Sequence, residues 1–455
     1  MHIAMKKIIL STALAMTSWL AAEAVSVAVA PGELHSAVTG NAVTELTVTG
    51  SLDVRDFAFI ADNLTELSAL NLSGATVVAY TCTGSECYFG SRGRFEADEL
   101  PRYAFFGSKL RSLSLPAGLR VVGEASVAAC EELEAITLPA GVREIGDHAF
   151  SASGLKSVVL NSREIGEGAF AGCAALASVE IGTGVIEIGD RAFAGCEALA
   201  IVEVADGSAL QEIGDEAFSG TALTSFDFAL CPNVEQVGEW AFAGTPIARV
   251  ALPGSLAEVP EGVFFGNASA QSVVLPEYAE EVGDYAFYGN TIAGNELVIP
   301  DKVAYIGDNA FEGARPASVK AYPPAVPELG KETFRGMNDD FRTPLYVTKD
   351  MIAAYKAADQ WCDFDIKDIS AIDAPMVGAE VAVRIGRIGS KLQIVATDNI
   401  DRANLYDEAG ALCDTARGTG CEATLNVAAI NSPVVIVEVR LHNGITRTFK
   451  LMAVK

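Results

Sequence analysis

One phrase recurs through the middle of the chain and constrains the fold more than any other feature. It consists of a branched aliphatic residue, Gly, an acidic residue, any residue, Ala and Phe. Complete copies occupy 145–150, 165–170, 188–193, 213–218, 237–242, 282–287 and 306–311. Degenerate copies end at Phe105, Val127, Phe264 and Phe334, so one unit spans between 20 and 25 residues. A repeat of this length predicts a solenoid, because one unit cannot bury its apolar face alone whereas stacked units can.

The second half of each unit predicts a strand. A small polar position follows the Phe and is Cys130, Cys173 or Cys196 in three copies. A Leu-x-x-Val-x-Leu pattern comes next, as in 155–160 and 176–181. Side chains alternate along a strand, so the residues that flank the central Val should face solvent. The three cysteines should be inert core thiols, since structural buried cysteines are unreactive.

These phrases resemble the BspA-like leucine-rich repeat family. The stretch Ile188–Cys196 and the leucine-rich strands carry the resemblance, which covers residues 100–340. It implies a leucine-rich repeat solenoid with a parallel β-sheet on one face and short irregular or helical turns on the other. Residues 25–99 should form an N-terminal cap and the first leucine-rich strands, with an insertion at 73–99. Residues 341–368 should close the solenoid.

A second domain is expected after a linker at 369–380. Residues 381–455 contain several short apolar runs separated by turn signals, which predicts a small sandwich-like β-domain. The phrase Leu405–Gly410, the apolar run Val434–Val439 and the end Phe449–Lys455 resemble the C-terminal sorting domain of the type IX secretion pathway. The alternative is a plain β-domain that closes the chain.

The N-terminus predicts export. Lys6 and Lys7 precede an apolar run, and Ala22-Glu23-Ala24 fits a cleavage site, so residues 1–24 should be a signal peptide. No membrane span is expected after cleavage. With the sorting resemblance, this places the protein at the cell surface or outside a Gram-negative bacterium. An oxidising compartment permits disulfides, and the close pairs are Cys82/Cys87 and Cys413/Cys421. The alternative for each pair is two free thiols.

Charge and missing motifs narrow the function. The chain has 59 acidic and 32 basic residues, a net charge of −27. Such a large negative charge argues against nucleic-acid binding and against docking on anionic membranes. The sequence carries no recognised catalytic, metal-binding or cofactor-binding motif. We therefore predict a protein that is not an enzyme and needs no cofactor or metal. A hydrolase with its site in the 73–99 insertion is the remaining enzymatic alternative.

The exposed sheet face is the predicted binding surface. Glu180, Glu203 and Asp227 occupy the same outward position of successive repeats, and Arg249 occupies the other outward position of the next one. They are candidate ligand-binding residues for a basic partner, or else ordinary solvated surface. The family resemblance implies adhesion to a host matrix protein or another cell-surface protein. A surface glycan- or nutrient-binding protein is the alternative. The sequence indicates no particular oligomeric state.

Overall fold

The chain divides into two compact units, residues 1–368 and 369–455. The computed structural model describes residues 23–39, 43–83, 87–91, 93–293, 295–339, 342–371, 383–388, 391–396, 400–407, 411–417, 422–426, 434–441 and 446–452. The expected signal peptide at 1–24 lies outside them, apart from Glu23 and Ala24, which begin the first strand. Each unit is considered by itself.

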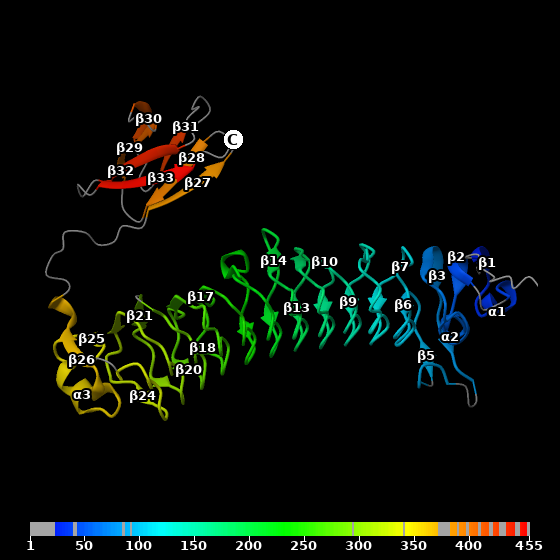
Figure 1. Ribbon diagram of the computed structural model, residues 1–455, viewed down its shortest axis with the longest axis horizontal. Coiled ribbons are helices and arrows are strands. Elements are labelled where there is room, and N and C mark those ends of the chain that lie inside the picture. Colours follow the sequence, from blue (N-terminus) through cyan, green and yellow to red (C-terminus); the bar gives the residue numbers. More distant parts are fainter. Residues whose placement is uncertain are drawn as a thin grey trace, which may run out of the picture. The chain divides into compact units, whose positions relative to one another are not determined.

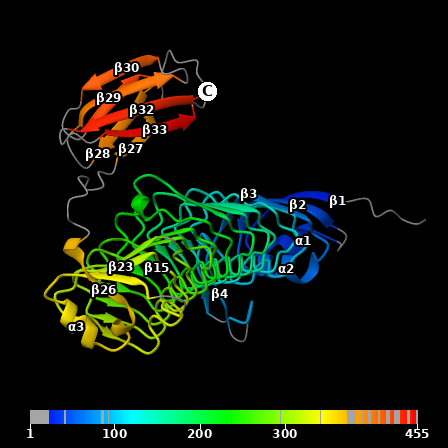
Figure 2. The same cartoon turned by 60° about the vertical axis from the view of Figure 1, so that its left-hand side comes forward.

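The first unit is the predicted repeat solenoid (Figures 1 and 2). Each turn of the solenoid is called a rung below. Most rungs place a longer strand on one side and a two-residue strand on the other, and neighbouring strands pair in parallel. The longer strands are β1 (Glu23–Val29), β2 (Val43–Leu52), β3 (Ala69–Val77), β7 (Ser112–Ser114), β10 (Ser157–Leu160), β12 (Ser178–Ile181), β14 (Ile201–Val204), β17 (Arg249–Ala251), β19 (Ser272–Val274), β21 (Glu296–Ile299), β23 (Ser318–Ala321), β25 (Pro344–Val347) and β26 (Asp365–Asp368).

The two-residue strands run along the opposite side of the solenoid. They are β6 (Glu99–Leu100), β8 (Val121–Val122), β9 (Glu144–Ile145), β11 (Glu164–Ile165), β13 (Glu187–Ile188), β15 (Glu212–Ile213), β16 (Gln236–Val237), β18 (Glu258–Val259), β20 (Glu281–Val282), β22 (Tyr305–Ile306) and β24 (Glu328–Leu329). In nearly all of them the second residue is a buried aliphatic and the first points outward. The repeated Ile or Val thus enters the core, and the residue before it reaches the surface.

The Phe of each repeat forms a continuous stack inside the solenoid. The rings of Phe150, Phe170, Phe193 and Phe218 have centroids 5.2 to 5.3 Å apart and planes within 9° of parallel. All four side chains are fully buried. The stack continues through Phe242, Phe264, Phe287, Phe311 and Phe334. Burial of one large ring per rung supplies much of the apolar area that each rung removes from water.

The turn before each Phe uses a left-handed backbone conformation. The residue between the acid and Ala has a positive φ in every copy, for example 55° at Arg191 and 57° at Trp240. This conformation turns the Arg191 N–H toward the carbonyl of Asp215 in the next rung, at 2.7 Å. The preceding glycine has another task, because a Cβ at Gly189 would lie 2.8 Å from the carbonyl oxygen of Ile165. Close approach of the rungs therefore excludes a side chain there.

The cysteines of the repeat are buried as expected. Cys130, Cys173 and Cys196 are fully buried. The thiol of Cys196 contacts the carbonyl oxygen of Phe170 at 3.1 Å, and Cys173 makes the same contact with Phe150. The adjoining thiol of Cys173 and burial both raise the pKa of Cys196, which keeps it in the thiol form.

Residues 221–262, called the joint below, are the one described place where both sheets are interrupted, although the sheet of longer strands also breaks between β7 and β10 and between β19 and β21. Residues 224–227 form no strand, and the chain makes a 3-10 turn, η1 (Phe228–Leu230), instead. The rings of Phe226 and Phe228 occupy the core against Phe242. On the other side β16 and β18 do not pair, since Pro260 stands where other rungs have a glycine N–H donor. The turn ladder continues, with the Trp240 N–H bonded to the Glu261 carbonyl at 2.9 Å.

Short helices close the solenoid at both ends. At the N-terminal end lie α1 (Leu34–Ala37) and α2 (Val54–Asn63), and Asp53 with Asp56 forms a capping box on α2. Strand β3 continues through Val77, so the irregular part of the predicted insertion begins later than 73; it contains the hairpin β4 (Tyr80–Thr81) and β5 (Arg94–Phe95). The C-terminal end has α3 (Ile352–Ala357) and η2 (Trp361–Asp363).

The second unit is a small β-domain made of two antiparallel sheets. After η3 (Ile369–Ala371), one sheet contains β27 (Val383–Ile388), β28 (Lys391–Ala396) and β31 (Glu422–Asn426). The other contains β29 (Ile400–Asp407), β30 (Leu412–Arg417), β32 (Val434–Leu441) and β33 (Thr446–Met452). Leu392, Ile394, Leu405, Leu425 and Val437 are buried between them. This arrangement agrees with the small sandwich-like β-domain predicted from the sequence.

We predict that Phe193→Ala lowers the free energy of unfolding of the solenoid by about 3–5 kcal/mol, because it removes a buried ring from the stack. Chemical denaturation followed by circular dichroism measures the change. Glu197→Ala, at an exposed position of the same rung, is the control and should alter stability by less than about 0.5 kcal/mol. Equal effects of the two substitutions would contradict the stack as the core of the fold.

Candidate functional site: an acidic groove at the joint

The predicted sheet-face residues are only partly brought together. Glu180 on β12 and Glu203 on β14 are register partners, and both are exposed. Asp227 does not extend their row, because it lies outside any strand and its carboxylate accepts the Ala229 N–H to cap η1. Arg249 belongs to β17, which starts a separate sheet. The prediction that the acidic row continues through Asp227 is therefore wrong. Phe226 and Phe228 pack into the core at this point, and the strand that would have carried Asp227 does not form.

The other sequence candidates show no site. Cys82, Cys87 and Cys413 are free thiols in the structure, and Cys421 lies outside the described residues, so both disulfides stay predictions. In the part of the chain that the structure describes, no group of three or more His, Cys, Asp or Glu side chains is placed to hold a metal ion. Among the described helices, none has the length and apolar character needed to cross a membrane.

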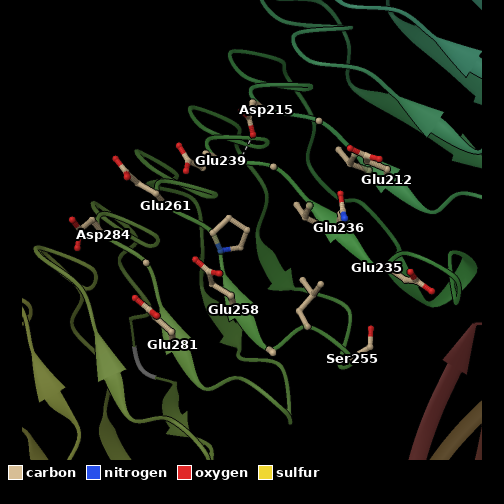
Figure 3. A pocket seen from close by; sticks show the side chains of 18 of the residues that line it. Glu212, Asp215, Glu235, Gln236, Glu239, Ser255, Glu258, Glu261, Glu281 and Asp284 are labelled. Carbon is tan, nitrogen blue, oxygen red and sulfur yellow. Dashed lines mark hydrogen bonds between the residues drawn. The ribbon is translucent and has the colours of Figure 1, made fainter.

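The structure gathers carboxylates on the side of the two-residue strands. A groove of about 860 Å³ lies there, across the joint (Figure 3). None of the described residues that line it is Lys, Arg or His. The carboxylates that line it are those of Asp190, Glu212, Asp215, Glu235, Glu239, Glu258, Glu261, Glu281 and Asp284. The groove therefore presents charge of one sign only.

The repeat itself explains the two main rows of this groove. One row, called the strand row, holds the first residues of the two-residue strands: Glu212, Gln236, Glu258 and Glu281. The other, called the turn row, holds the acids of the recurring phrase, from Asp215 through Glu239 and Glu261 to Asp284 (Figure 3). Parallel strands repeat at about 4.8 Å, so like charges stand one above another. The groove lies where β16 and β18 fail to pair.

Backbone hydrogen bonds hold in place two carboxylates of the turn row and that of Asp190, the equivalent residue of the preceding rung. Oδ1 of Asp190 accepts the N–H of Asp215 at 2.8 Å, and Oδ1 of Asp215 accepts the N–H of Glu239 at 2.8 Å. Oδ1 of Asp284 likewise accepts the N–H of Asp308 at 2.6 Å. Each aspartate thus ties one rung to the next. The same bond fixes the direction of a negative charge at the edge of the groove.

The groove has a strongly negative local environment. Partial burial, followed by the charges of Glu239 and Asp284, raises the pKa of Glu261. Tyr305 also lines the groove. Its burial, followed by the charges of Asp284 and Asp308, raises the pKa of its hydroxyl group. Among the described residues, no ion pair links a carboxylate of the groove to a Lys or Arg. These carboxylates repel one another, and a bound cationic group would relieve that repulsion.

Sequence reasoning missed this groove although its signals were present. Glu precedes the aliphatic residue of the phrase in four successive copies, at 144, 164, 187 and 212. Residues 192–301 contain 17 acidic residues and one basic residue, Arg249. What the sequence did not display was the joint, which opens the surface between the rows.

The fold and its repeated phrases are those of a leucine-rich repeat solenoid. More specifically, residues 98–209 and 201–318 match the BspA type leucine rich repeat region, with six copies of the motif, and the chain carries such a region. Members of this family are generally non-enzymatic binding proteins and are typically surface-associated or secreted. No curated protein matches the sequence.

Several solved structures are similar to this chain. A leucine-rich repeat protein from Bacteroides ovatus is 20% identical, with 62% of this chain and 90% of that chain covered and a TM-score of 0.38. A leucine rich cell surface protein from Faecalibacterium prausnitzii is 19% identical, with coverages of 60% and 77% and a TM-score of 0.31. The pneumococcal vaccine antigen PcpA is 14% identical, with coverages of 77% and 84% and a TM-score of 0.27.

We predict that Glu187→Gln raises the melting temperature at neutral pH and that this gain disappears in acid. Burial, then Glu212 and Glu164 on the neighbouring rungs, raises the pKa of Glu187 in the folded protein. Its charge therefore costs stability above the folded pKa, and protonation removes this cost as the pH falls toward the ordinary carboxyl pKa of about 4.3. Thermal melts across this range measure the effect. Glu197→Gln is the control, and an equal, pH-independent gain in both variants would contradict the prediction.

Proposed function

We propose that this protein is an exported, non-enzymatic surface protein that adheres to a host matrix protein or another cell-surface protein through its acidic groove. The observation that supports this role most directly is the groove itself, in which nine carboxylates line one surface and none of the described lining residues is Lys, Arg or His. A partner with a basic surface matches this charge. Adhesion is the use to which the family resemblance points.

The geometry suits a macromolecular partner better than a small ligand. The groove extends over rungs from Asp190 to Tyr305, and its charged side chains stand on a rigid stack of strands. Complementary charges of this kind raise the rate of association and exclude partners of the wrong sign. Because exposed carboxylates are screened by salt, binding should weaken as ionic strength rises.

Export is part of the same proposal. The signal peptide at residues 1–24 would direct the chain out of the cytoplasm, and the second unit would act as a type IX sorting domain at the surface of a Gram-negative bacterium. The support is the phrase Leu405–Gly410, whose first three residues belong to β29, and the apolar strand β32. Deletion of residues 369–455, with the chain then found in the medium or periplasm instead of at the surface, tests this route.

We predict that the mature chain binds one or more immobilised matrix proteins and that this binding depends on the strand row. The variant Glu212→Gln, Glu258→Gln, Glu281→Gln removes three charges from the groove and leaves the aspartates that bond the backbone intact. Its affinity should fall about tenfold or more at low salt and less at high salt. Surface plasmon resonance on a panel of matrix proteins and glycans measures both.

The matched control removes three charges from the longer-strand side: Glu180→Gln, Glu203→Gln and Asp227→Asn. The Asn side chain keeps an oxygen that can accept the Ala229 N–H. This variant has the same net charge as the groove variant, so it separates a local effect from a general one. Equal losses in both variants would show that the groove is not the site. Salt-independent binding of a glycan, unaffected by either variant, would favour the nutrient-binding alternative.

A further inference from the structure

Four aromatic side chains border the acidic groove on the turn side of the solenoid. They are Trp240, Phe265, Tyr285 and Tyr288, called the aromatic quartet below. The ring centroids of Trp240 and Phe265 are 5.1 Å apart, and those of Phe265 and Tyr288 are 4.8 Å apart. Trp240 and Tyr285 are 6.3 Å apart. All four residues are only partly buried, so the cluster leaves apolar surface in contact with water.

The repeat does not require aromatic residues at these positions. Trp240 and Tyr285 occupy the left-handed position of the turn, where other rungs have Arg191, Glu216 or Asn309. Phe265 and Tyr288 follow the stacked Phe, where most other rungs have Ala or Ser. The quartet spans three successive rungs that begin at the joint. Aromatic residues recur at both positions in the first rung, as Tyr103 and Phe106. The rungs between these two places lack them, so the fold does not require aromatic side chains there.

A glycine makes room for the largest ring. Gly262 holds the left-handed position between Trp240 and Tyr285. A Cβ at Gly262 would lie 2.4 Å from Cδ2 of Trp240, so the indole ring rests directly on this glycine. A side chain there would displace the ring toward solvent. The glycine thus allows the four rings to meet as one surface across the rungs.

Charge identifies the kind of ligand that this surface fits. Glu239, Glu261 and Asp284 come directly before Trp240, Gly262 and Tyr285, so carboxylates of the turn row stand beside the rings. Residues 250–301 contain no Lys or Arg. An arginine side chain matches both features at once, since its planar guanidinium packs on aromatic rings and pairs with carboxylates. A lysine ammonium is more strongly hydrated and gains less from such rings.

We propose that the aromatic quartet, together with Glu239, Glu261 and Asp284, binds arginine side chains in an extended segment of a basic partner protein. This inference rests on the proposed function, because it assigns a specificity element to the same groove. The carboxylates attract any cationic segment, and the rings select arginine over lysine. The rows repeat along the rungs, so an extended segment parallel to the solenoid axis can place several side chains in equivalent positions.

Titration calorimetry of the mature chain with octa-arginine and octa-lysine peptides tests this selectivity. The quartet variant Trp240→Asn, Phe265→Ala, Tyr285→Asn, Tyr288→Ala uses residues that other rungs carry at the same positions. We predict that it weakens octa-arginine binding at least about tenfold and octa-lysine binding less than about threefold. The variant Glu239→Gln, Glu261→Gln, Asp284→Asn should weaken both peptides to a similar degree. The Asp284→Asn substitution keeps an oxygen that can accept the Asp308 N–H.

The outcomes separate this inference from the proposed function. Unchanged octa-arginine affinity in the quartet variant would overturn the inference and leave the groove as a general cation-binding surface. The same result with a lowered melting temperature would assign the rings to structure alone. Binding of neither peptide by the wild-type chain would overturn both proposals. Glycan binding that is lost in the quartet variant would show that the rings bind a sugar and not arginine. Trp240→Asn alone, expected to reduce the arginine preference, serves if the quadruple variant does not fold.

Discussion

The structure depends on one backbone turn that ties each rung to the next. In this turn a left-handed residue directs its N–H to the following rung, and the N–H of the adjoining Phe does the same, as Phe193 does to Ala217 at 2.8 Å. The turn sets the rung spacing and so brings the Phe rings into contact. The dependence is clearest at the joint, where both sheets lose their pairing and the ladder through Trp240 and Phe242 persists. Side-chain identity at the left-handed position is free, because the backbone makes the bond.

The acidic groove follows from this spacing. The repeat that buries an aliphatic residue and a Phe has an acid between them and, in most rungs, a Glu just before the aliphatic residue, so most rungs add a carboxylate to each of two rows. Neighbouring rungs bring like charges together, and burial, followed by these charges, raises the pKa values of Glu187 and Glu261. The missing N–H of Pro260 and the rings of Phe226 and Phe228 interrupt the sheets and turn the rows into the walls of a groove.

The sequence predicts the structural features that recur in every regular repeat, but it does not predict the structure where the repeat is irregular. The stacked Phe, the buried cysteines and the leucine-rich strands follow from period and side-chain alternation, and the structure contains them. The regular spacing from Glu203 predicts a strand at Asp227, but bulky Phe side chains replace the usual Val and Leu and the strand is lost. The strand row is hard to find in the sequence because its glutamates precede the phrase that defines the repeat. The groove forms because side chains from rungs of unequal structure lie close together, and the spacing of residues in the sequence does not reveal such proximity.

The position of the charged residues along the chain is more informative than the net charge of the whole chain. Residues 369–455 contain equal numbers of acidic and basic residues, so the whole deficit of −27 belongs to residues 1–368. Within that part, most of the imbalance falls in 192–301, the stretch that contains the joint, the groove and the aromatic quartet. A uniformly acidic surface would serve solubility, which needs no particular arrangement. An imbalance that coincides with a break in both sheets, and with rings that the repeat does not require, concentrates charge and apolar surface where a partner can contact both at once.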